Sequence, residues 1–152
     1  MSELTDIYFR SVGRNSVLLL NIPPDTQGLL SAADVVRLRE FRERVDRELP
    51  EDLGRGAVVR SSPGVFTVDL GAEREVERIR LAEDIRHGQQ VESFVVEAYG
   101  AGAWSRVAGA GTIGASRILL PPPVRARHWR LRVTRSRQTA RIAQFALLRS
   151  RI

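Results

Sequence analysis

Apolar residues recur at every second position through much of the second half of the chain, and this spacing constrains the fold most. Trp129, Leu131 and Val133, for example, alternate with polar neighbours. Side chains two positions apart on a strand lie on the same face of a sheet. Turn residues separate these runs at intervals of roughly ten residues, which is typical of an antiparallel β-sandwich. The sequence therefore predicts a mainly β fold with a jelly-roll type of sandwich over residues 65–152, and places Trp104 and Trp129 in its core.

The first part of the chain follows other patterns. Val17–Ile22 is a continuous apolar run ended by two prolines, which predicts a strand of a parallel sheet that is buried on both faces. Ser31 lies three residues before Asp34, a spacing that favours a helix start. An amphipathic helix is predicted from about Ala32 to Leu49, and the glycine-containing residues 51–64 are predicted to be a linker.

The basic charge is concentrated in the sandwich region. The chain carries a net charge of +6, and residues 55–152 hold 17 Arg against 8 acidic residues, a net +9. These arginines alternate with apolar residues along the predicted strands, so they indicate the solvated face of a sheet. A nucleic-acid site would interleave them with stacking aromatics, and nucleic acid is not an expected partner. A basic module that binds polyanions remains an alternative.

Several classes of site are excluded by residue type and length. The chain has no cysteine, which excludes disulfides, zinc thiolate sites and cysteine nucleophiles; no metal or cofactor is predicted. With 152 residues, the chain is also shorter than a complete (β/α)8 barrel of roughly 250 residues. The N-terminus lacks a basic leader, and Val17–Leu20 is too short for a signal core or a membrane span. No signal peptide or membrane partner is predicted, and the localisation stays unknown.

Two motifs resemble parts of a known enzyme family. Tyr8–Ser16 followed by Leu18–Asp25 resembles the last barrel strand of the α-L-fucosidases of glycoside hydrolase family 29, whose final barrel helix would be the helix from Ala32. Leu81–Ile85 and Gly88–Val91, with further residues such as Trp104 and the run Thr112-Ile113-Gly114, resemble the discoidin-like sandwich (coagulation factor five/eight C-terminal type) of many bacterial members. The resemblance implies that residues 1–50 are a remnant of the catalytic barrel and that the sandwich is shortened at its N-terminal side.

The resemblance also bears on catalysis. Family members use an aspartate nucleophile and a separate acid/base carboxylate, and the motifs that carry both are expected upstream of Met1. No catalytic residue is therefore predicted here, and this chain alone is predicted to be inactive. In a completed barrel, Asn21 and Asp25 would border the sugar pocket. For Asp25 the alternative is a carboxylate that stabilises the turn after the two prolines.

The predicted sandwich carries the candidates for carbohydrate binding. Discoidin-like domains commonly bind glycans with loops at one end, using arginine, histidine and aromatic residues. Arg86 and His87 precede Gly88 in such a loop, and Tyr99 and Arg117 are further candidates. Each of the loop residues has the alternative of being simply solvated. The expected ligand is a fucosylated or galactose-type glycan.

Three functions follow from these patterns. The first is a non-catalytic accessory and carbohydrate-binding fragment of an α-L-fucosidase-like glycoside hydrolase. The second is the C-terminal part of a split or truncated fucosidase that is active only with a separately encoded catalytic barrel. The third is the basic interaction module. Family members are often exported, which this chain does not indicate by itself.

Overall fold

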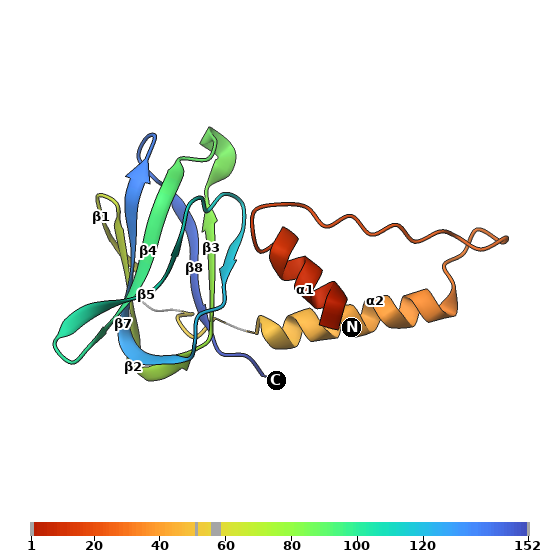
Figure 1. The fold of residues 1–152 in the computed structure, drawn as a ribbon, viewed down its shortest axis with the longest axis horizontal. Helices are drawn as coiled ribbons and strands as arrows, with labels where there is room; N and C mark the ends of the chain where they lie inside the picture. The colour runs from red at the N-terminus through yellow and green to blue at the C-terminus, as the bar shows by residue number, and fades with distance from the viewer. Residues whose placement is uncertain (1, 51, 56–58, 152) are drawn as a thin grey trace.

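The computed structural model describes residues 2–50, 52–55 and 59–151. Two α-helices lie to one side of a β-sandwich, and a long extended segment runs beside them (Figure 1). The predicted mainly β, antiparallel fold is confirmed. Over the ranges that the structure describes, no helix has both the length and the apolar character needed to cross a membrane.

The sandwich is built from two sheets. The larger has the strand order β1-β2-β7-β4-β5 and the smaller β6-β3-β8, and the strand pairs found in the described ranges are antiparallel. A 3-10 turn, Ile85–His87, follows β3. The strand bounds are β1 Val59–Ser62, β2 Val65–Val76, β3 Arg78–Glu83, β4 Val91–Gly100, β5 Ala103–Ala110, β6 Arg117–Leu119, β7 Val124–Ser136 and β8 Ile142–Leu148.

The core lies between the two sheets, where the alternating apolar residues of both meet. Trp129 is completely buried, as predicted, and its indole N–H donates to the carbonyl of Ala126 at 3.3 Å. A buried tryptophan needs such a partner for its one polar atom. The other large side chains that are fully buried come from both sheets and, for Ile113, from the loop before β6: Phe94, Ile79, Leu81, Ile113, Leu131, Leu147, Val76, Val91 and Val96.

The carboxylate of Glu83 joins three segments at one end of the sandwich. Glu83 is only 4% exposed, and it accepts hydrogen bonds from the backbone N–H groups of Gln90 at 2.9 Å, Val91 at 3.0 Å and Gly114 at 2.8 Å. A buried carboxylate is tolerated when its oxygens are satisfied in this way. Glu83 therefore fixes the start of β4 and the loop before β6 to the end of β3.

The N-terminal region contains two helices, α1 Ser2–Ser11 and α2 Ala32–Glu48. The second confirms the predicted helix, and Ser31 caps it by accepting the N–H of Asp34 at 3.1 Å. The first was not predicted. It packs on α2 through an edge-to-face contact of Tyr8 with Phe41, at 6.0 Å between ring centroids.

The prediction of a strand at Val17–Ile22 is wrong for the chain by itself. These residues are extended but pair with no strand that the structure describes. A strand needs a neighbour to bind its backbone N–H and C=O groups, and the sheets of the sandwich lie elsewhere. The predicted linker, residues 51–64, contains a strand instead: β1 pairs with β2, so the larger sheet begins before residue 65.

Substitution of Glu83 by Gln tests its structural role. The amide keeps one acceptor oxygen, but its NH2 group then faces at least one buried backbone N–H that loses its acceptor. We expect the free energy of unfolding to fall by about 2–4 kcal/mol, measured by urea denaturation. Glu73→Gln is the matched control at an exposed position, with an expected change within about 0.5 kcal/mol. Equal stability of the two variants would contradict the role of Glu83.

Candidate functional site

The predicted pocket-rim residues lie on the extended segment, which leads away from the sandwich before α2 returns to it (Figure 1). Asn21 is exposed. One carboxylate oxygen of Asp25 accepts the backbone N–H groups of Gln27 at 2.8 Å and Leu29 at 2.9 Å. Asp25 thus stabilises the turn between the segment and α2, which is the alternative that the sequence left open.

The extended segment presents apolar side chains to solvent. Val17 is 84% exposed and Leu19 is 89% exposed, and past the turn Leu29 is 60% exposed. Single exposed apolar residues are ordinary on protein surfaces, but a contiguous apolar strip marks a contact site. We call residues 17–22 the apolar segment.

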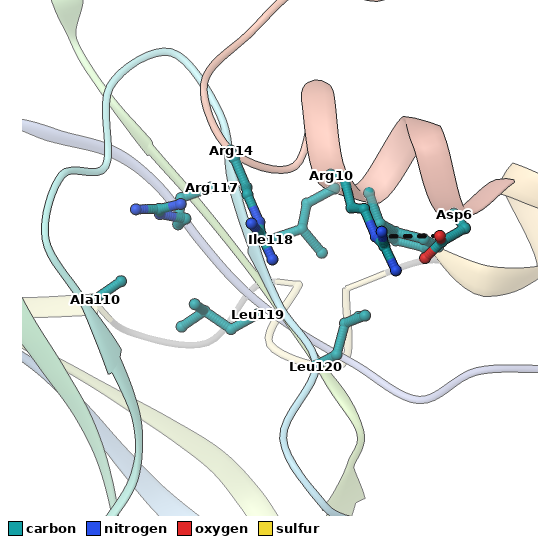
Figure 2. Close-up of a pocket in the computed structure, with 9 residues that line it drawn as sticks. Asp6, Arg10, Arg14, Ala110, Arg117, Ile118, Leu119 and Leu120 are labelled. Carbon is teal, nitrogen blue, oxygen red and sulfur yellow. Dashed lines mark ion pairs between the residues drawn. The ribbon is translucent and has the colours of Figure 1, made fainter. Parts of the chain in front are cut away.

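Arg117 lies at the junction between the N-terminal region and the sandwich, in a cavity of about 510 Å³ between α1 and β6. Figure 2 shows Arg10, Arg14 and Arg117 around this cavity, with Arg10 paired to Asp6. Arg117 donates to the carbonyl of Thr112 at 2.8 Å. Burial, and to a smaller degree the charge of Arg14, lowers the pKa of Arg117. Through this hydrogen bond, Arg117 stabilises the loop before β6.

Asn15 attaches the N-terminal region to the same loop. It adopts a left-handed conformation, with φ of 65°. Its side-chain oxygen accepts the N–H of Ala115 at 2.7 Å, and its NH2 group donates to Gln89 at 2.9 Å. Gly114 permits this approach because any Cβ at that position would overlap the Asn15 amide, and its own φ is also positive. The start of the apolar segment is therefore held in a fixed place.

The other end of the helical region is attached through α2. Glu48, near the C-terminus of the helix, binds Arg78 of β3 at 2.9 Å and Arg44 of the same helix at 3.1 Å. Its carboxylate is almost buried. Together with Asn15 and the backbone hydrogen bond from the Ile118 N–H to the Gly13 carbonyl, this pairing fixes the helices and the apolar segment relative to the sandwich.

Arg86 and His87 lie on the 3-10 turn after β3. Arg86 donates to both oxygens of Asp84, at 2.8 and 2.6 Å, and this pairing holds the pKa of Asp84 well below its usual range. The charge of Arg86 is thus compensated locally. His87 lines a cavity of about 160 Å³ together with Gln90 and Arg141.

Tyr99 lies far along the sandwich from the 3-10 turn that carries Arg86 and His87. It ends β4 beside the turn to β5, at the lower left of Figure 1, whereas the 3-10 turn of Arg86 lies at the top of the sandwich. Its ring contacts those of Trp104, at 5.3 Å, and His128, at 6.4 Å between centroids. The four predicted carbohydrate-binding residues therefore do not meet in one site.

Trp104 was predicted in the core, and this is wrong. It is partly exposed and pairs directly with Tyr99 across the two strands, on the outer face of the larger sheet. The guanidinium of Arg130 lies 4.4 Å from its ring centroid. The prediction failed because the register of β4 and β5 shifts between Val96 and Glu97. The shift exchanges the faces of β5, so alternation traced back from Ala108 assigns Trp104 to the wrong side.

Comparisons with known proteins identify the lineage. Alpha-L-fucosidase 1 of Arabidopsis thaliana is 31% identical over an alignment of 150 residues, and the match covers 77% of this chain and 30% of that protein. The crystal structure of an α-L-fucosidase homologue from Bacteroides ovatus matches 99% of this chain and 26% of its own with a TM-score of 0.82 and 40% identity. A glycoside hydrolase 29 family member from a rumen bacterium matches 98% of this chain and 28% of its own with a TM-score of 0.86 and 30% identity.

The chain is homologous to the C-terminal part of family 29 α-L-fucosidases. It spans only 30% to 34% of the length of the curated relatives that it matches. No protein-family model matches the chain. The resemblance of its motifs to this fucosidase family is thereby confirmed, and the activity of the complete relatives is a separate question.

Asn15→Ala tests the attachment of the fucosidase-like N-terminal region to the sandwich. Loss of the bonds to Ala115 and Gln89 is expected to reduce stability by about 1 kcal/mol and to speed hydrogen exchange at the Ala115 amide. The control is Asn21→Ala in the exposed segment, which is expected to change neither quantity. Unchanged exchange at Ala115 in the Asn15 variant would show that the attachment rests on other contacts.

Proposed function

We propose that this chain is the non-catalytic C-terminal part of an α-L-fucosidase-like glycoside hydrolase, and that its apolar segment packs onto the catalytic barrel while its β-sandwich binds carbohydrate. The observation that carries the proposal is the exposure of the apolar segment, residues 17–22, beside an otherwise well-packed sandwich. The homology to complete fucosidases supports the choice of a barrel as the partner.

Burial on a barrel would cover the exposed side chains of the apolar segment and provide hydrogen-bond partners for its backbone. Covering side chains such as Val17 and Leu19 contributes about 1.5–3 kcal/mol each. A neighbouring parallel strand would also supply partners for the backbone groups of the segment. The segment is followed by a turn and then by α2, which is the strand-then-helix order of a (β/α)8 barrel.

The docking surface is already formed in this chain. Asn15 holds the start of the apolar segment, and Glu48 holds the end of α2 on the sandwich. A surface fixed in advance loses less conformational freedom on binding. This favours association with a barrel whether it belongs to the same polypeptide or is encoded separately, so the split-enzyme alternative remains part of the proposal.

The basic interaction module receives less support. Arginines on the outer face of β7 are paired with acids of adjacent strands: Arg127 with Asp69, Arg130 with Glu97, and Arg135 with Glu92. Each pairing neutralises a charge that a polyanion would need. These three arginines are therefore less available to a polyanion, although the sandwich region as a whole keeps its net positive charge.

A chimeric enzyme tests the docking. The catalytic barrel of the Bacteroides ovatus homologue is expressed with its C-terminal region replaced by this chain, and hydrolysis of nitrophenyl α-L-fucoside is measured beside the unaltered homologue. We expect the chimera to be soluble and active. Leu19→Asp in the chimera is expected to abolish soluble, active enzyme because it places a charge in the barrel sheet.

The matched control is Gln138→Asp, which introduces the same charge in an exposed loop of the sandwich and is expected to leave activity unchanged. Activity that survives Leu19→Asp would show that the apolar segment does not enter the barrel. An inactive chimera beside an active parent would contradict the docking of this chain onto a barrel.

A further inference from the structure

A groove on the outer face of the larger sheet crosses four neighbouring strands. Thr67 and Asp69 come from β2, His128 from β7, Tyr99 from β4 and Trp104 from β5. The groove has a volume of about 350 Å³, near the lower end of the range for small-molecule sites of about 300–1,000 Å³. We call it the sheet groove.

Three rings form its aromatic side. The planes of Tyr99 and Trp104 make an angle of 62°, and those of Tyr99 and His128 make an angle of 76°. The rings therefore do not lie flat against one another, and Tyr99 is 41% exposed. Exposed aromatic side chains with fixed neighbours offer contact area at a low cost in conformational freedom.

Trp104 is held in position by an ion pair on the same outer face of the sheet. Glu97, whose side chain is only 9% exposed, binds Arg130 at 2.6 Å and Arg132 at 3.4 Å. Hydrogen bonding to Arg130, and more weakly to Arg132, lowers the pKa of Glu97 against the opposing effect of burial. The carboxylate thus stays ionised at neutral pH and keeps the Arg130 guanidinium against the Trp104 ring.

The opposite side of the groove is polar but carries little net charge. Asp69 accepts two hydrogen bonds from Arg127, at 2.7 and 2.8 Å, and one from the N–H of Gly71 at 2.8 Å. These bonds hold the pKa of Asp69 well below its usual range. His128, one of the three rings of the aromatic side, lies beside Asp69, with 3.8 Å between its Nδ1 and the carboxylate oxygen Oδ1. The side therefore offers hydrogen-bonding groups next to a compensated ion pair.

We infer that the sheet groove binds a neutral pyranose residue of a glycan. A pyranose combines a face of C–H groups, which packs on aromatic rings, with a rim of hydroxyls that bond to carboxylate and imidazole groups. An anionic ligand would be repelled by the Asp69 carboxylate. A wholly apolar ligand would remove solvent from that carboxylate without offering it a new hydrogen bond. The inference rests on the proposed carbohydrate-binding role of the sandwich and is independent of barrel docking.

The chain has two tryptophans, which allows a direct test by nuclear magnetic resonance. Both tryptophans line the groove, but Trp104 is partly exposed, whereas Trp129 is completely buried and its indole N–H is bonded to the Ala126 carbonyl. A ligand on the outer face therefore contacts Trp104 directly, and a titration that follows the two indole N–H signals separates groove binding from a general change. The probes are fucosyllactose, lactose and N-acetyllactosamine. We expect the Trp104 signal to shift with at least one of them, and the Trp129 signal to move less.

Variants locate the site, and their binding is measured by isothermal titration calorimetry, because substitution of Trp104 removes the reporter signal itself. Tyr99→Ala and Trp104→Ala are expected to weaken binding by about tenfold or more, and Trp104→Phe less, because it keeps a ring. Arg86→Ala and His87→Ala, in the loop at the other end of the sandwich, are expected to bind as the unaltered chain does. The thermal unfolding midpoint of each variant shows that the fold is retained, and Tyr99→Ala, at an exposed position, removes a ring with the smallest risk to the core.

The outcomes separate this inference from the proposed function. Binding that is lost in Arg86→Ala or His87→Ala but kept in Tyr99→Ala and Trp104→Ala would overturn the sheet groove and leave a carbohydrate-binding sandwich. Failure of all three glycans to bind would overturn both the sheet groove and the carbohydrate-binding role of the sandwich. A Trp104 shift that disappears in Tyr99→Ala but remains in Arg86→Ala and His87→Ala, together with weaker calorimetric binding by Trp104→Ala, would support the inference.

Discussion

The contact between the two sheets positions every other part of this chain. The five-stranded and three-stranded sheets bury their apolar faces on each other, with Trp129 and Phe94 at the centre. Burial of large side chains is the main stabilising contribution to such a sandwich. Glu83 then fixes the loops at one end, and those loops carry Gly114 and Ala115, to which Asn15 is attached. The N-terminal region is thus placed by contacts that only a folded sandwich provides.

The apolar segment, in contrast to the buried faces of the two sheets, leaves large apolar side chains uncovered. Its side chains have the composition of a buried strand, yet Val17 and Leu19 face solvent, and the sheets of the sandwich offer it no edge. Exposed strands of this composition invite association with other chains. Because the chain is homologous to part of a much longer enzyme, we propose that a catalytic barrel covers the segment. The sandwich and the docking surface then have separate functions, because the sheet groove lies on the β2-β7-β4-β5 face.

Local patterns were sufficient to predict part of the structure. Alternation along Trp129–Val133 and the capped start at Ser31 depend on nearby residues, and both elements were predicted correctly. A strand at Val17–Ile22 depends on a neighbour that this chain does not supply, so composition alone could not decide it. The helix at Ser2–Ser11 is short and rests on its packing with Phe41, which no local pattern reveals.

The same distinction applies to the candidate site. Tyr99 was predicted from its residue type, but its partners depend on tertiary contacts. Trp104 reaches it through a register shift within the hairpin, and His128 through the pairing of β4 with β7. Arg86 and His87 were predicted to be in a loop, which is correct, but the pairing of Arg86 with Asp84 was not foreseen. The sequence thus indicated the residue types of the proposed carbohydrate site, and the fold determines which of them lie close together.

Hydrogen exchange of the apolar segment tests the central claim most directly. The backbone amides of residues 17–22 are compared by mass spectrometry in this chain alone and in the chimera that carries a catalytic barrel. The account predicts rapid exchange in the chain alone, because the segment pairs with no described strand, and strong protection in the chimera, where a barrel strand supplies the partners. Equal exchange of these amides in the two proteins would contradict it.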